Sequence, residues 1–444
     1  MACIKPFRGI RYNPKKIDGM EKVVTPPYDV ISPEDQNLYY KNDAYNVVRL
    51  DFGKIKENDN ELENRYTRAA EAFESWQKEG ILLRDSKPAI YLHHISYEAQ
   101  GRRLTRKGFI SLVRVEDFAS GVIKPHERTF PKVTADRLRL MEQCAANFSP
   151  VFSIYDDPPG ETIGILENKR PHLPLFSFQD RDGFKHEMWA LEDGKTLAEF
   201  GRCMEPKTLF IADGHHRYTT ALEYRDKMRQ GIGNWSNNQS VNHIMMYLCS
   251  MQDDGMLILP THRLVTRKRG WSFENYMDKM LLYFEMHKVS MSGQDVSARS
   301  RFALEKLADA GKRTSAIGIY TGSDDFLLLE LKNRKCLETL GREIPEPLPD
   351  LDVVILSELV FGRVMGLDDK NGGDAVSYCH DPCDIMRRAE ENENDCAFLL
   401  NPTGIEQVRD VALAGLVMPH KSTYFYPKIL TGLVMNKIVP EEEV

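Results

Sequence analysis

The sequence lacks long apolar runs. No uninterrupted apolar stretch in its 444 residues reaches the length that spans a bilayer, and residues 1–6 carry no apolar core of a secretion signal. We therefore expect a cytoplasmic protein without a membrane partner. The eight cysteines are few for this length and are scattered, which is typical of reduced thiols rather than of a disulfide framework.

Two common nucleotide-binding patterns are also missing. There is no Gly-x-x-x-x-Gly-Lys-Ser/Thr loop and no Gly-x-Gly-x-x-Gly fingerprint, which argues against a P-loop or a Rossmann kinase. An excess of positive charge is absent too, because 59 Lys and Arg stand against 66 Asp and Glu, for a net charge of -7. Such a chain is expected to have no nucleic-acid partner. The short basic runs Arg102-Arg103 and Arg106-Lys107 are predicted to be solvated turns.

What is present is a mixture of helical and strand periodicity. Apolar residues at helical spacing predict a helix over 61–78, while 89–95 and 108–115 are predicted to be strands flanking a polar turn at 98–106. The segment 117–251 predicts a strand, a helix, a strand, and then a strand that leads into a helix. The expected fold class is α+β, a mixed α/β fold, and the length indicates more than one domain.

The sharpest chemical motif is Asp213-Gly214-His215-His216-Arg217, which follows an apolar strand and opens a helix. Free backbone N–H groups at a helix start attract anions, Gly lets a phosphate approach, and Arg can bind it with two hydrogen bonds. The adjacent imidazoles can donate hydrogen bonds or move a proton near neutral pH. The motif therefore predicts a phosphate- or nucleotide-binding turn. The alternative is a plain strand-to-helix turn with incidental imidazoles.

A second motif, Pro125-His126-Glu127, stands where another predicted strand ends. A carboxylate in this position can take a proton from a substrate hydroxyl. It is not a zinc-protease motif, because Phe130 occupies the place of the second His. The alternative is a solvated pair of Glu127 with the neighbouring Arg128.

Three further motifs are candidates for binding substrate or phosphate in the same pocket. Each has a structural alternative: a Pro-Pro turn for the first, a buried salt bridge for the second, and a packed C-terminal strand with solvated lysines for the third. The candidate residues are Tyr28 and Asp29; His262 and Arg263; and Lys421, Ser422, Thr423 and Lys428.

The middle of the chain resembles the free-serine kinases of the ParB/sulfiredoxin-like fold, through residues 123–127, 149–152 and 211–218. The resemblance places the catalytic glutamate on Glu127 and the phosphate loop on Asp213, Gly214, His216 and Arg217; we group His126 and His216 with Glu127 as the catalytic set. The chain as a whole resembles a family known only as domain of unknown function 1015. The carriers of that second resemblance include Pro26–Ser32, Pro125–Glu127, Ala212–Tyr218, Pro260–Arg263 and Pro419–Lys428.

The resemblance implies three parts: an N-terminal α+β segment at 1–118, a ParB/sulfiredoxin-like core at 119–255 with an insertion at about 156–206, and a C-terminal α+β domain at 256–444. It implies transfer of a phosphoryl group to a small-molecule hydroxyl, with Mg²⁺. The leading acceptor is free L-serine, giving O-phospho-L-serine, and the donor is ATP, ADP or pyrophosphate. The alternative is a nucleotide- or phosphate-binding regulatory protein without kinase activity.

Overall fold

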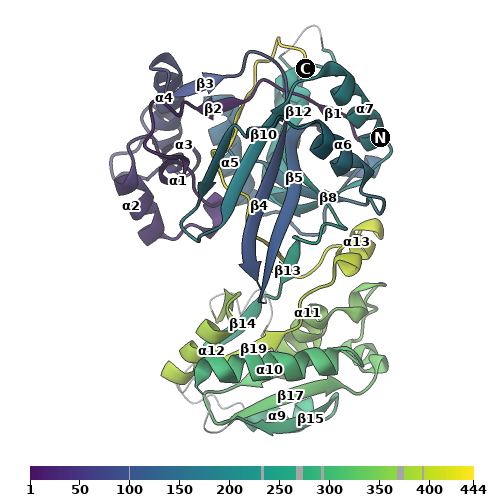
Figure 1. Ribbon diagram of the computed structural model, residues 1–444. Coiled ribbons are helices and arrows are strands. Elements are labelled where there is room, and N and C mark those ends of the chain that lie inside the picture. Colours follow the sequence, from purple (N-terminus) through teal and green to yellow (C-terminus); the bar gives the residue numbers. More distant parts are fainter. Residues whose placement is uncertain (100, 232–234, 267–273, 292–294, 368–374, 393–394) are drawn as a thin grey trace. The chain divides into compact units, whose positions relative to one another are not determined.

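The chain forms two compact units in the computed structural model (Figure 1). The structure describes residues 1–444 except residue 100 and the segments 232–234, 267–273, 292–294, 368–374 and 393–394. Unit 1 comprises residues 1–257 and 427–444, and unit 2 comprises residues 258–426. Both units contain helices and strands, so the predicted mixed α/β fold class is confirmed.

Unit 1 is built on a large mixed sheet. Among the described residues it has nine strands, ordered β6-β11-β8-β12-β5-β4-β10-β9, with the short β1 paired to β5. Two strand pairs, β6 with β11 and β8 with β12, are parallel and the others are antiparallel. The strands are β1 (Ile4–Lys5), β4 (Ile90–Ala99), β5 (Arg102–Arg114), β6 (Ile123–Lys124), β8 (Val151–Tyr155), β9 (Phe176–Gln179), β10 (Lys185–Leu191), β11 (Leu209–Asp213) and β12 (His243–Ser250).

The two faces of this sheet differ. One face is apolar and packs against three helices, whose buried residues include Leu166, Phe200 and Tyr218. These helices are α6 (Glu161–Lys169), α7 (Gly194–Met204) and α8 (His215–Arg229). The opposite face carries aromatic and polar side chains, among them His93 and Tyr247. A second helix layer joins α8 through α5 (Pro131–Cys144), which packs against α8.

The N-terminal helices gather beside the sheet (Figure 1). They are α1 (Met20–Val23), α2 (Pro33–Asn42), α3 (Val48–Asp51) and α4 (Arg65–Lys78). The remaining elements of unit 1 are 3-10 turns at Tyr28–Val30, Phe118–Ser120 and Ser240–Asn242 and the short strands β2 (Ile10–Tyr12), β3 (Leu82–Arg84), β7 (Ala146–Asn147) and β21 (Asn436–Lys437).

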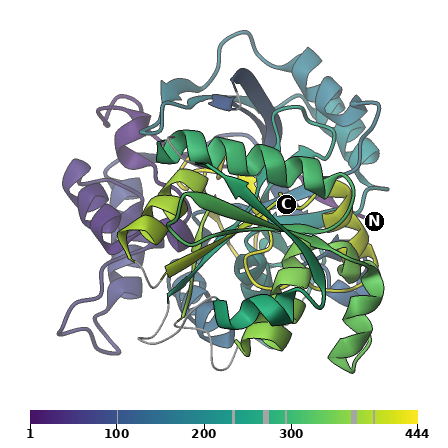
Figure 2. The ribbon, with the colours of Figure 1, turned by 90° about the horizontal axis from the view of Figure 1, so that it is seen from below.

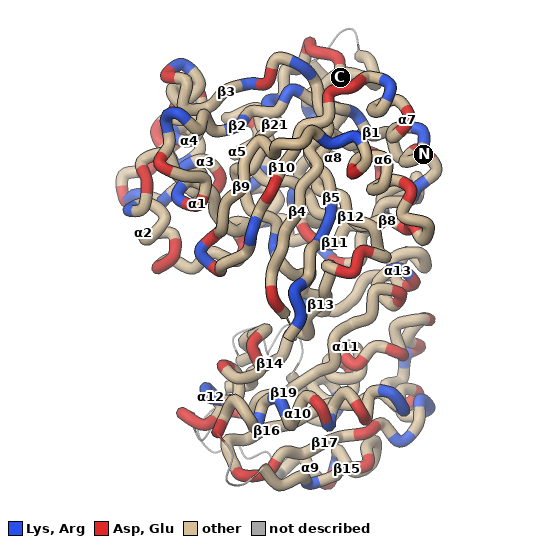
Figure 3. The backbone as a smooth tube through the Cα atoms, in the orientation of Figure 1, with Lys and Arg blue, Asp and Glu red and all other residues tan. Residues whose placement is uncertain are grey.

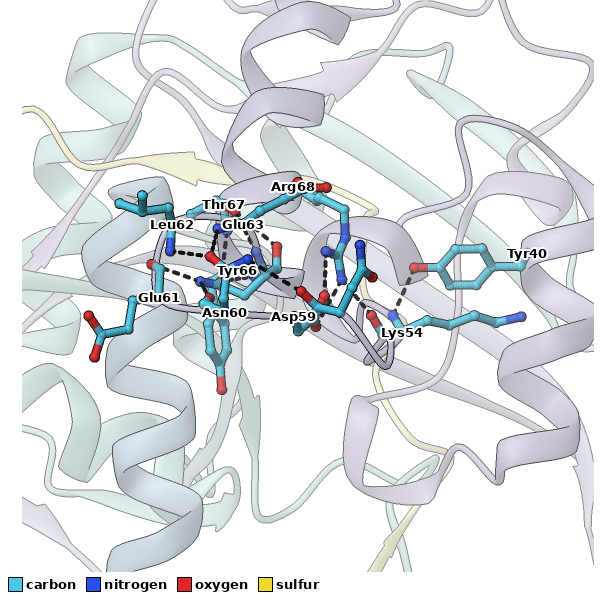
Figure 4. Close-up of polar contacts among 12 residues, drawn as sticks. Tyr40, Lys54, Asp59, Asn60, Glu61, Leu62, Glu63, Tyr66, Thr67 and Arg68 are labelled. Atoms are coloured by element: carbon cyan, nitrogen blue, oxygen red, sulfur yellow. Dashed lines mark hydrogen bonds and ion pairs between the residues drawn. The ribbon is translucent and has the colours of Figure 1, made fainter.

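Helix α4 starts four residues later than the sequence predicts. The Asn60 side chain accepts hydrogen bonds from the backbone of Leu62 and Glu63, which closes a turn in front of the helix (Figure 4). Asn64 then caps the helix by accepting from the N–H groups of Tyr66 and Thr67. Asn side chains compete with helical hydrogen bonds in this way, so the apolar periodicity alone placed the helix start too early.

Unit 2 has its own six-stranded antiparallel sheet, ordered β15-β17-β16-β19-β14-β18 among the described residues. Helices α10 and α12 bury apolar residues against it, and Figure 2 shows α10 lying across the strands. The elements are β13 (Leu257–Leu259), β14 (His262–Thr266), α9 (Glu274–Met280), β15 (Phe284–Ser290), α10 (Val296–Gly311), β16 (Ala316–Tyr320), β17 (Asp325–Leu331), α11 (Asp352–Val354), β18 (Val376–Cys379), α12 (Pro382–Glu391), β19 (Asp395–Leu400), α13 (Ile405–Leu413) and β20 (Tyr424–Tyr426), with 3-10 turns at Arg334–Leu340 and Leu348–Asp350 and a π-helix at Ile355–Met365.

Charged residues of both signs are interspersed along the elements of each unit (Figure 3). Among the described helices, none combines the length and the apolar character that crossing a membrane would need.

The units divide the chain differently from the three predicted parts. The predicted boundary at 118/119 falls inside one sheet, because β5 from the first part pairs along its length with β12 from the second. The segment 156–206, predicted to be an insertion, supplies β9, β10, α6 and α7 to that same sheet and its cover. The boundary near 255 lies close to the end of unit 1, but residues 427–444 return to unit 1. Hydrogen-bonded strand pairing across more than 100 residues is not visible in local patterns.

Candidate functional site

The predicted strand-to-helix turn exists and is tightly built. Strand β11 ends at Asp213, Gly214 has a φ of 90°, and helix α8 begins at His215, within the predicted motif. A left-handed conformation of this kind is costly for residues with a Cβ. A Cβ on Gly214 would also lie 2.9 Å from Nε of Arg217. Glycine is therefore required both for the turn and for the close packing of the arginine.

Asp213 lies in a largely buried cluster with two cations. Its Oδ2 is 3.0 Å from Nζ of Lys428, and its Oδ1 is 3.8 Å from Nη2 of Arg217. Arg217 also donates a hydrogen bond from Nη1 to the carbonyl of Pro150. Burial alone would raise the pKa of Asp213, but Lys428 and Arg217 outweigh it and hold the pKa far below its usual range. The cluster is thus an ionised carboxylate with two cations, for a net charge of about +1.

The motif 125–127 lies against the start of α8. The backbone N–H of His126 donates to Nε2 of His215 at 3.2 Å, and Nδ1 of His215 is 3.8 Å from Oε2 of Glu127. Burial lowers the pKa of His126 to about 4, and burial together with the nearby His126 lowers the pKa of His215 well below its usual value. Both imidazoles are therefore neutral at pH 7. Because Nε2 of His215 accepts a hydrogen bond, its proton resides on Nδ1, facing Glu127.

His216 serves the loop that follows Glu127. Its Nε2 accepts a hydrogen bond from the backbone N–H of Phe130 at 2.9 Å, and the two rings stack with centroids 5.8 Å apart. Helix α5 starts at the next residue, Pro131. His216 thus ties the segment that carries Glu127 to the start of α8.

A cavity of about 280 Å³ opens at this point of unit 1. Such a volume corresponds to roughly nine water molecules, which suits a small metabolite and is too small for a whole nucleotide. The residues that line it are Phe118, Pro125, Glu127, Arg128, Thr129, His215 and Thr219.

Tyr28 adjoins a buried arginine that the sequence analysis missed. The guanidinium of Arg137 lies 4.1 Å from the centre of the Tyr28 ring. Burial, reinforced by Asp29, raises the pKa of Tyr28, while Arg137 and Arg217 act against the rise. Arg137 donates to the carbonyl of Asp51 and to the Asp136 carboxylate at 2.6 to 2.8 Å. The only sequence signal was an Asp-Arg pair inside a predicted helix, which carries no chemical pattern of its own.

The predicted pair His262 and Arg263 lies in unit 2. Arg263 is buried and donates to the carbonyls of Thr261 and Lys421. Burial lowers the pKa of Arg263 to about 10 and that of His262 to about 3. Nδ1 of His262 accepts from the N–H of Leu400 at 3.2 Å. Backbone carbonyls thus bind the Arg263 guanidinium. The structural alternative considered from the sequence was a buried salt bridge.

The predicted C-terminal clamp is split between the units. Ser422 is buried in unit 2, where its hydroxyl donates to the carbonyl of Pro419 at 2.6 Å, and Lys421 and Thr423 flank it. Lys428 belongs to unit 1, where it pairs with Asp213. Of these four residues, Lys428 is the one that the structure joins to the Asp213 turn.

The fold and the site define a mixed α/β protein with a buried acidic and cationic cluster at a strand-to-helix turn. Residues 4–354 match the family described as "Protein of unknown function (DUF1015)", and the chain belongs to this family. No curated protein matches the chain.

Several solved structures are similar at low identity. A conserved hypothetical protein from Pyrococcus furiosus is 12% identical, with a TM-score of 0.33, covering 71% of this chain and 90% of that one. A free serine kinase in complex with AMP is 13% identical, with a TM-score of 0.35, covering 73% and 92%. SbnI with a C-terminal truncation, from Staphylococcus aureus, is 12% identical, with a TM-score of 0.33, covering 72% and 85%. Similarities this weak carry no argument about activity.

Proposed function

We propose that the protein is a small-molecule kinase, which transfers a phosphoryl group to a hydroxyl. The observation that carries the proposal is the position of Glu127. Its carboxylate lines a metabolite-sized cavity and faces the N–H of His215, which is the second residue after Asp213. A base for the acceptor and a cationic turn for the donor are thus adjacent in space, although they are far apart in the sequence.

Glu127 is the proposed base. The acceptor oxygen attacks the terminal phosphorus, a new P–O bond forms, the P–O bond to the leaving group breaks, and Glu127 takes the hydroxyl proton. The neutral His215 supports this role, because its Nδ1–H orients the carboxylate without adding a positive charge that would weaken the base. We assign His126 and His216 to positioning, since the backbone N–H of His126 binds the His215 ring and the ring of His216 binds the backbone of Phe130.

The donor phosphates are assigned to the start of α8. Its free N–H groups, with Arg217 and Lys428, provide positive charge at one place. Among the described residues no three His, Cys, Asp or Glu side chains group to hold a metal. Mg²⁺ is usually held by one or two protein carboxylates and by substrate phosphates. Asp213 is the carboxylate that would help to hold Mg²⁺, which would supply neutralising charge to the phosphate oxygens.

The acceptor we propose is free L-serine, giving O-phospho-L-serine. The cavity volume fits an amino acid of this size, and Arg128 on its wall offers a cation to a carboxylate. ATP, ADP and pyrophosphate are the donors to compare. Incubating the protein with Mg²⁺, L-serine and each donor in turn, and following the products by ³¹P NMR, tests both assignments together. If no phosphomonoester forms from any donor, the serine-kinase proposal is wrong.

The role of Glu127 is tested by Glu127→Gln. We expect turnover to fall at least about 100-fold, while the affinity for the donor changes little, because general-base catalysis contributes roughly 10²–10⁴. Glu167→Gln is a matched control: Glu167 also pairs with an imidazole, that of His94 at 2.5 Å, but does not line the cavity. Unchanged turnover in Glu127→Gln would remove this residue from the mechanism. Donor binding without turnover in the unmodified protein would favour the alternative, a nucleotide- or phosphate-binding regulatory protein.

A further inference from the structure

Arg106 is a fully buried arginine that the kinase proposal does not use. The sequence predicted a solvated turn here. This is wrong, because Arg106 lies within strand β5 and its side chain is fully buried. Within the described part of the chain, none of its Nε, Nη1 and Nη2 atoms has a hydrogen-bond partner. A guanidinium keeps its charge inside proteins, and burying it without an acceptor costs several kcal/mol. The arrangement calls for an acceptor from outside the chain.

Aromatic rings cover the guanidinium of Arg106. The centres of the Phe152 and Tyr247 rings lie 5.0 and 5.3 Å from its central carbon. The hydroxyl of Tyr247 is also buried; burial raises its pKa and the nearby Arg106 acts against that rise, but no hydrogen bond of good geometry joins the hydroxyl to a described residue. It fits only because residue 108 is glycine, where a Cβ would lie 2.3 Å from that hydroxyl. Two polar groups whose hydrogen-bonding capacity is not filled by well-formed bonds therefore lie beside each other.

Asp253 does not neutralise Arg106 directly. Its two carboxylate oxygens accept hydrogen bonds from the backbone N–H groups of Lys107 and Gly255, at 3.1 and 3.0 Å. Burial raises the pKa of Asp253 to about 6, and the positive charge of Arg106 acts against the rise only through space. The carboxylate therefore leaves the donors of Arg106 unfilled.

A chain of two histidines brings an acceptor to the same face of the sheet. Nε2 of His186 is 3.0 Å from the Asp180 carboxylate, and Nδ1 of His186 is 3.1 Å from Nε2 of His93. The carboxylate accepts, and the tautomer of His186 with its single proton on Nε2 satisfies it and accepts on Nδ1. His93 then donates from Nε2, which leaves a lone pair on its Nδ1. That Nδ1 has no partner among the described residues, and the His93 ring lies 6.0 Å from that of Tyr247.

We propose that Arg106, Tyr247 and His93 bind a protonated phosphate group, as free hydrogen phosphate or as a phosphate monoester. The guanidinium and the hydroxyl donate to phosphate oxygens, and Nδ1 of His93 accepts the remaining P–OH. A sulfate ion has the same shape but carries no proton at neutral pH, so it cannot satisfy His93. The site lies on the face of the sheet that carries Asp213, since Phe152 pairs directly with Asp213. It shares no residue with the proposed kinase chemistry.

Thermal unfolding of the full-length protein tests this site. At constant ionic strength, we expect phosphate to raise Tm more than sulfate does, with AMP as the monoester probe. A rise with phosphate alone assigns the site to the free ion, and a rise with AMP assigns it to a monoester. Because an unpaired buried charge is replaced by an apolar chain of similar length, Arg106→Met is expected to fold. It should weaken phosphate binding at least about 30-fold, whereas Arg103→Met, on the exposed part of the same strand, should not.

A second variant tests the site even if Arg106→Met does not fold. Tyr247→Phe removes one hydroxyl and should weaken phosphate binding several-fold with little change in Tm without ligand. The proposal is overturned if phosphate stabilises Arg106→Met as much as the unmodified protein, or if no phosphate compound stabilises the unmodified protein. Because binding is read out without turnover, this failure is separable from failure of the kinase proposal.

Discussion

Removing the Lys428 ammonium by Lys428→Met is the most informative test of the Asp213 cluster. The two side chains retain only 14% and 15% exposure and their charged atoms are 3.0 Å apart. Breaking a buried pair by removing one partner typically costs 3–5 kcal/mol. Arg217, at 3.8 Å, still attracts the carboxylate, so we expect the lower end of that range, about 3 kcal/mol. An exposed pair serves as the control: Lys78→Met, beside Glu74, should cost less than about 1 kcal/mol.

The pH dependence sharpens this prediction. In the unmodified protein the pKa of Asp213 is depressed, so its stabilising contribution is complete above the unfolded pKa of about 4 and is lost as the pH falls through the folded value. Without Lys428, burial, which is the largest single influence on this group, is opposed less strongly and the pKa rises. Protonation then relieves the buried charge. The loss of stability in Lys428→Met should therefore be largest at pH 7 and smaller at pH 4.5.

Urea unfolding followed by tryptophan fluorescence is a suitable assay. Trp76, Trp189 and Trp235, three of the four tryptophans, lie in unit 1 together with Asp213 and Lys428, so the signal follows this unit. A loss in Lys428→Met no greater than in Lys78→Met would refute the argument. So would a loss that stays the same at pH 7 and pH 4.5.

Two further predictions concern the same turn. Gly214→Ala forces a Cβ into a φ of 90° and against Arg217, so it should lower the free energy of unfolding by about 2 kcal/mol; a change under 0.5 kcal/mol in urea titrations would contradict the strain. The pKa of His126 is about 4 in the fold and about 6.5 when unfolded, so the unfolded state binds its proton first and stability falls on acidification. Between pH 7 and pH 5 this group contributes a loss of about 2 kcal/mol, which His126→Gln should remove; parallel pH profiles of the two proteins would rule it out.

Local patterns were sufficient for the parts of the site that are continuous in sequence. An apolar run followed by Asp-Gly predicted the end of β11 and the start of α8, because strand burial and a left-handed glycine depend on residues only a few positions apart. The same reasoning marked Glu127 after β6. Helix limits were less well predicted, as the capped start of α4 at Asn64 shows.

By itself, then, the sequence determined the class of fold, the strand-to-helix turn and the chemical types at the candidate site. Only the tertiary structure decided which distant residues complete it. Lys428 stands 215 residues after its partner Asp213, and Arg106 is buried only because its strand lies between two others in the sheet. Periodicity reports whether a residue can face a core, but strand order and chain return are set by packing over the whole unit. For that reason two short basic segments of similar sequence differ in burial: Arg103 is exposed, whereas Arg106 is buried.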